Sequence, residues 1–168
     1  MERRIKLTLL KQLETWLHHS EKIVILGVGN PLRGDDAVGT QIVRQLQGKV
    51  PNHVSLIPCE TVPENFTGKI IKLNPTHVLI IDSAEMNESP GTIRLSPATK
   101  IAGLAVSTHN APLSMLTDYL KHAINPKMAL LGIQPKQTEF NKGLSEEAQK
   151  ASDRVVMVLE RLLNRGRG

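Results

Sequence analysis

The sequence is poor in cysteine and in aromatic residues. Of its 168 residues only one is Cys, at position 59, and Phe, Trp and Tyr together make up 2%. A single cysteine excludes an internal disulfide and every CxxC metal or redox motif. We expect Cys59, which falls in a predicted strand, to be a small buried core residue. With so few aromatics the core must consist mostly of Leu, Ile, Val and Ala, and stacking platforms for single-stranded nucleic acid are scarce.

Long apolar runs are also missing. None approaches the roughly 20 residues that a membrane span needs. The apolar positions near the N-terminus are interrupted by Lys11, Gln12 and Glu14, which is unlike a signal peptide. We therefore expect a cytoplasmic protein with no membrane partner. The net charge of +5 could suit nucleic acid, but the basic residues are scattered, so we expect a solvated surface and no nucleic-acid partner.

Apolar runs of strand type alternate with helical patterns along the chain. Strands are predicted at about 23–28, 53–60, 77–82, 92–95 and 128–133, and helices at about 4–18, 35–47, 63–74, 112–124 and 148–162. Such alternation is typical of an α/β fold. We expect a single domain over 1–168, with residues 1–20 as an N-terminal helical extension. The domain should be a twisted, mostly parallel sheet with helices on both faces.

The most informative segment is 23–39, in which an apolar strand runs into the Gly-rich turn GVGNPLRGDD. Asp35 and Asp36 stand where the following helix begins. A helix N-terminus after a parallel strand usually suits an anion. Because the chain supplies its own negative charges here, the segment favours a cation instead.

Two further polar residues are expected at the same edge of the sheet. Asp82 follows the apolar strand 77–82, and His109 lies in the loop 107–112, which leads into a helix. With Asp36 they form an O, O, N set suited to a borderline divalent ion such as Zn, Ni or Fe. Each residue also has a purely structural interpretation. Asp36 would be favoured at a helix start by the helix dipole, Asp82 would be a turn residue, and His109 would be an ordinary loop histidine. The other five histidines are expected at the surface or at strand edges.

Other chemistries fit less well. A dinucleotide fingerprint, GxGxxG, fails because Leu32 stands where the third Gly belongs, and Asp35 and Asp36 would repel a pyrophosphate. The nucleophile elbow GxSxG of serine hydrolases is absent. Asp36 and Asp82 could instead share a proton as in aspartic proteases, provided that they face each other.

Six motifs occur together in order. They are GVGNPLRGDD at 27–36, VPEN at 62–65, IIDSAEM at 80–86, SPGTIRL at 89–95, STHNAPLSML at 107–116 and LLGIQPKQTEF at 130–140. In this combination the chain resembles the hydrogenase maturation endopeptidases over about 23–163. These proteins trim a C-terminal peptide from the large subunit of [NiFe] hydrogenases.

The resemblance implies a peptidase whose partner is the large-subunit precursor. Carried over by motif, Asp36, Asp82 and His109 are the catalytic and metal-contacting residues. They would recognise nickel already installed in the precursor, so the ion is part of the substrate and not a permanent cofactor. Relatives cut after a basic residue. The family often has Gly after the two acids, where this chain has Ala37.

Two alternatives remain at this point. Peptidyl-tRNA hydrolases also have a strand that ends in a Gly-x-Asn-Pro turn, but the His that follows it in them is missing from 35–40 here. A non-catalytic metal or phosphate binder would keep the fold alone. The sequence leaves the oligomeric state open and is compatible with a monomer.

Overall fold

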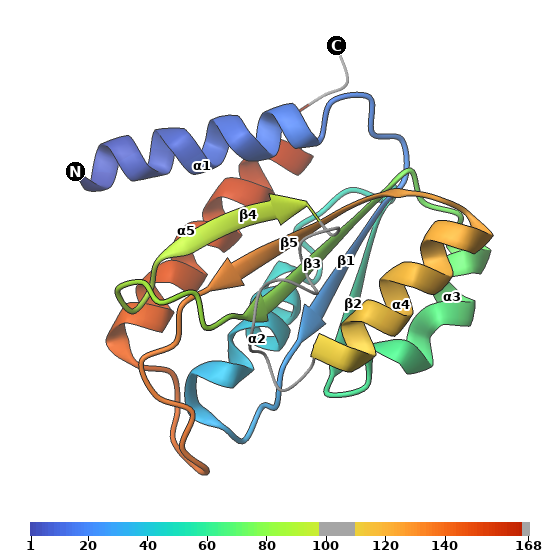
Figure 1. Cartoon of the computed structure of the whole chain (residues 1–168). Helices are drawn as coiled ribbons and strands as arrows, with labels where there is room; N and C mark the ends of the chain where they lie inside the picture. Colours follow the sequence, from blue (N-terminus) through green and yellow to red (C-terminus); the bar gives the residue numbers. More distant parts are fainter. Residues whose placement is uncertain (98–109, 166–168) are drawn as a thin grey trace.

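A five-stranded sheet forms the centre of the molecule in the computed structural model, which describes residues 1–97 and 110–165 (Figure 1). The spatial order of the strands is β2-β1-β3-β5-β4. Their bounds are Ile23–Val28 (β1), Val54–Glu60 (β2), His77–Ser83 (β3), Ile93–Pro97 (β4) and Lys127–Ile133 (β5). All pairs are parallel except β4 with β5. The predicted mostly parallel α/β fold is confirmed.

Helices cover both faces of this sheet. They are α1 (Glu2–Trp16), α2 (Val38–Leu46), α3 (Thr67–Leu73), α4 (Asn110–Ala123) and α5 (Glu146–Leu163), with short 3₁₀ turns η1 (Gly34–Ala37) and η2 (Pro63–Phe66). Figure 1 shows α3 and α4 on one face and α1, α2 and α5 on the other. Successive side chains of a strand point to opposite faces. Accordingly Ile23 and Ile25 belong to the core under α2 and α5, and Val24 and Leu26 to the core under α3 and α4.

The N-terminal extension is part of the core. Leu9, Leu13 and Trp16 of α1 are buried in the same apolar cluster as α2 and α5. Trp16 also packs edge-on against the His77 ring, with centroids 5.1 Å apart. His77 begins β3, as expected for a strand-edge histidine, but it is 5% exposed and so is a buried residue and not a surface one.

The remaining differences from the predicted elements are shifts of one or two residues, at element starts and ends alike. The predicted helices at 35–47 and 63–74 each open with a 3₁₀ turn before the α-helix begins. Cys59 is 1% exposed, as predicted, and burial raises the pKa of its thiol to about 12. Within the described residues, the helices are too short or too polar to cross a bilayer.

Candidate functional site

The turn between β1 and α2 brings the acidic pair to the carboxyl edge of the sheet. The arrowheads of β1, β3 and β5 reach this edge together in Figure 1. Two glycines permit the close approach. A Cβ at Gly39 would overlap the carbonyl oxygens of Val28 and Ile81, and Gly29, with φ +137°, lies against the backbone of Asp36. The turn is therefore pressed directly onto the ends of β1 and β3.

Asp36 lies in this turn with its carboxylate oriented by two neighbours. It is 7% exposed. One oxygen, Oδ2, accepts a hydrogen bond from the backbone N–H of Asn30 (2.8 Å), and Oδ1 accepts one from the Ser83 hydroxyl (2.9 Å). Hydrogen bonds to the two oxygens from different elements fix the plane of the carboxylate relative to the sheet edge.

Asp35 faces a different part of the molecule. It is 1% exposed. Its Oδ2 accepts bonds from the backbone N–H groups of Lys136 (2.7 Å) and Gln137 (3.2 Å) and from the Ser145 hydroxyl (2.8 Å), while Oδ1 accepts the Ser145 N–H (2.7 Å). Three of these bonds end on Oδ2 and one on Oδ1, so both oxygens of this buried carboxylate are held by the surrounding fold. Asp35 therefore joins the β1 turn to the loop after β5 and to Ser145, the N-cap of α5.

Asp82 is the penultimate residue of β3 and is 1% exposed. Residues Val78 and Ile80 belong to the core under α3 and α4, so strand alternation places Asp82 on that same face. Ser83, which bonds Asp36, is on the α2 face. The structure thus brings Asp36 to the end of β3, one residue from Asp82.

His109, the third predicted site residue, lies outside the described residues. The structure describes α4 from Asn110, the residue that follows it. Within 1–97 and 110–165, no three His, Cys, Asp or Glu side chains are grouped as a metal site. Ala37, which departs from the family pattern, has φ −74° and ψ −9°. This is ordinary right-handed helical backbone, so no glycine is needed there.

Two polar residues of the site were not found from the sequence. Ser83 follows Asp82 at the end of β3, and its bond to Asp36 spans 47 positions. Gln134, after β5, is 4% exposed, and its Oε1 accepts from the N–H groups of Met86 and Glu88. It thereby holds the loop that follows β3. The polar character of Ser83 at the end of an apolar strand was the only signal available.

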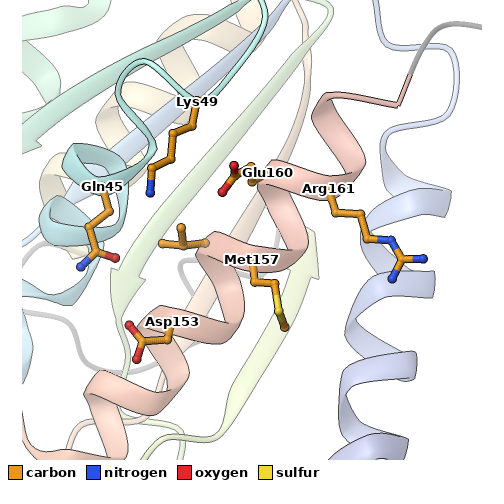
Figure 2. Close-up of a pocket in the computed structure, with 7 residues that line it drawn as sticks. Gln45, Lys49, Asp153, Met157, Glu160 and Arg161 are labelled. Atoms are coloured by element: carbon orange, nitrogen blue, oxygen red, sulfur yellow. The ribbon is translucent and has the colours of Figure 1, made fainter.

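A separate hollow of about 470 Å³ lies between α2 and α5 (Figure 2). It is lined by Gln45, Lys49, Asp153, Val156, Met157, Glu160 and Arg161. Its charged side chains are of both signs. Gln45 is nine positions beyond Asp36, which along a helix is about 13 Å. This hollow is therefore separate from the acidic residues of the sheet edge.

Several known proteins are similar to this chain in sequence and in fold. Residues 40–162 match the family model described as hydrogenase maturation protease, HycI. The chain is 39% identical over 151 residues to a putative hydrogenase maturation protease of Methanocaldococcus jannaschii, covering 85% of this chain and 89% of the relative. It is 34% identical over 138 residues to the hydrogenase 3 maturation protease of Escherichia coli K12, covering 82% and 88%. The crystal structure of a [NiFe] hydrogenase maturation protease HycI from Thermococcus kodakarensis is similar with a TM-score of 0.85 and 30% identity, covering 92% of this chain and 99% of that one.

Proposed function

The chain belongs to the hydrogenase maturation protease family and is a peptidase, and we propose that it removes the C-terminal peptide from the large-subunit precursor of a [NiFe] hydrogenase. In this proposal the enzyme acts after nickel has been inserted, and the nickel is a part of the substrate that the enzyme recognises. A cytoplasmic site of action is compatible with the single buried thiol of Cys59. The peptidyl-tRNA hydrolase alternative receives no support from these similarities.

The observation that carries the proposal is the placement of two buried carboxylates around the end of β3. Asp36 is bonded to Ser83, and Asp82 precedes Ser83 on the strand. Asp82 is on the face that α4 covers, and His109 directly precedes α4. We therefore propose that Asp36, Asp82 and His109 contact the nickel of the precursor, because two carboxylate oxygens and an imidazole suit a borderline divalent ion.

Asp36, and not Asp35, is the carboxylate that we assign to the reaction. A general base must accept a proton from the attacking water. Asp35 already accepts four internal hydrogen bonds, so its oxygens are committed to the fold. Asp36 is oriented at the sheet edge by Asn30 and Ser83. The nickel would hold the precursor in place, and Asp36 would direct a water molecule to the scissile carbonyl.

Cleavage of a nickel-loaded precursor by single-residue variants tests this assignment. We expect Asp36→Asn, Asp82→Asn and His109→Ala each to lower the single-turnover rate about 10²-fold or more, the usual contribution of a positioned catalytic group. Asp36→Asn should keep its fold, because an amide can accept from Asn30 and donate to the Ser83 hydroxyl. The control is Asp153→Asn on α5, in the hollow between α2 and α5. Variants that cut at the wild-type rate would contradict the assignment.

A further inference from the structure

A second groove lies on the opposite face of the sheet from the hollow of Figure 2. It has a volume of about 410 Å³ and runs between η2–α3 and α4, which are side by side in Figure 1. It is lined by Glu64, Thr67, Gly68, Ile71, Met115, Leu116 and Tyr119. Among the described residues of this lining Glu64 is the one that carries a charge, and most of the others are apolar or uncharged.

The α4 wall of the groove presents apolar side chains to solvent. Met115 is 67% exposed and Tyr119 is 60% exposed. They are four positions apart and so are neighbours on one side of the helix. Leu116, between them in sequence, is buried in the core. The exposed pair therefore adds nothing to the core and forms a surface against which another chain can pack.

Glu64 brings a negative charge to the groove. Its Oε2 is buried and accepts no hydrogen bond from the described residues, and no salt bridge there joins Glu64 to a cation. A carboxylate oxygen removed from water without a partner is costly. A Lys or Arg side chain entering the groove would supply the missing donor. Its methylenes would pack against the apolar wall.

Both walls of the groove begin at the candidate site. The η2 turn follows the carboxyl end of β2, where the Glu60 carbonyl accepts the N–H of Gly29 in the β1 turn (2.8 Å). The other wall, α4, begins one residue after His109. A peptide held at Asp36 and Asp82 can therefore extend from the sheet edge into the groove.

We propose that this groove binds a basic side chain, flanked by apolar residues, of the precursor segment that the enzyme cuts, with Glu64 as its ion-pair partner. This inference rests on the proposed function, since it takes the precursor as the occupant. Glu64 is here a specificity-determining residue and takes no part in bond cleavage. Its effect is therefore expected on substrate binding, while the reaction step is left unchanged.

The test is cleavage of a nickel-loaded precursor by Glu64→Gln and Tyr119→Ala, with KM and kcat measured separately. We expect Glu64→Gln to raise KM roughly 10-fold or more with little change in kcat, as is typical for the loss of a charged hydrogen bond. Tyr119→Ala, at an exposed position, should also raise KM. The matched control is Glu160→Gln, in the hollow between α2 and α5, which should leave both constants unchanged.

Exchanging the charges of Glu64 and of its partner in the precursor distinguishes recognition of the basic side chain from a structural effect of the Glu64 substitution. Each basic residue of the precursor segment is replaced in turn by Glu, and we expect one such precursor to be cut poorly by wild type and to recover with Glu64→Lys. Wild-type KM in Glu64→Gln, or no recovery by Glu64→Lys, would overturn the inference and leave the proposed function intact.

Binding of a synthetic peptide with the sequence of that segment, measured by fluorescence anisotropy, is independent of cleavage. We expect Glu64→Gln to weaken it. Glu64-dependent binding by a wild-type enzyme that fails to cut the precursor would support the inference and overturn the proposed function. Equal binding by wild type and Glu64→Gln would overturn the inference.

Discussion

At the scale of single residues, the neighbouring acids Asp35 and Asp36 have different surroundings. Asp35 accepts bonds from Lys136, Gln137 and Ser145, about 100 positions away in the sequence. Asp36 accepts bonds from Asn30 and Ser83 at the sheet edge. We therefore expect a substitution of Asp35 to affect stability first, and one of Asp36 to affect activity first.

Replacing Asp35 with Asn tests this difference. The amide oxygen can keep the bonds on one side, but its NH₂ group must then face another donor. Leaving a buried donor unsatisfied costs about 1–3 kcal/mol, so we expect Asp35→Asn to lower the free energy of unfolding by about that amount in urea denaturation. Cleavage should persist wherever the variant is folded. A fully stable but inactive Asp35→Asn would show instead that Asp35 takes part in the chemistry.

The sequence indicates these residues unequally. Asp36 and Asp82 follow apolar strands, and a parallel sheet brings the ends of its strands to one edge, so their placement at the edge could be predicted. The bonds from Ser83 to Asp36 and from Ser145 to Asp35 could not. They depend on how two loops pack, and Ser is common at many surface and cap positions without any such contact.

At the scale of elements, α1 is joined to the sheet through one aromatic contact as well as through its leucines. The Trp16 ring packs against His77, which is paired in register with Lys127 on β5. Burial, with the nearby Lys127 charge, lowers the pKa of His77 below its ordinary value of 6.5. The folded protein therefore favours a neutral imidazole beneath α1.

A pH-dependent stability follows from that lowered pKa. Below pH 6.5 the unfolded chain binds a proton at His77 that the folded chain resists, so stability is full above pH 6.5 and falls as the pH drops toward the folded pKa. We expect urea denaturation between pH 7.5 and 5.5 to show a steeper loss for wild type than for His77→Gln. The difference should be at most about 1.4 kcal/mol per pH unit. Parallel curves for the two proteins would contradict this expectation.

The long apolar elements were predictable and the polar ones less so. The buried strand β1 has the predicted bounds, and β3 is one residue longer than predicted, because continuous apolar runs mark central parallel strands. The antiparallel direction of β4 relative to β5 was not predictable from the sequence. Its pattern, IRLSP, is short and half polar, and only its pairing with β5 makes it antiparallel. Burial of His77 depends on α1 folding back over the sheet, which no local pattern indicates.

At the scale of the whole molecule, the two faces of the sheet differ. The face under α1, α2 and α5 carries the larger core cluster and includes the N-terminal helix. The face under α3 and α4 carries the second cluster and the groove with Glu64. Asp82 is on this second face, and the walls of the groove begin at the sheet edge where Asp82 lies. We therefore expect the precursor to approach along the α3–α4 side.

The central proposal is that the enzyme recognises nickel held by its substrate, and one measurement tests it directly. Nickel-loaded and nickel-free forms of the same large-subunit precursor are incubated with the wild-type protein, and the products are weighed by intact-protein mass spectrometry. We predict that one defined C-terminal peptide is released from the loaded form, and little or none from the nickel-free form. Equal cleavage of the two forms would contradict nickel recognition, and would favour an aspartic-protease-like use of Asp36 and Asp82.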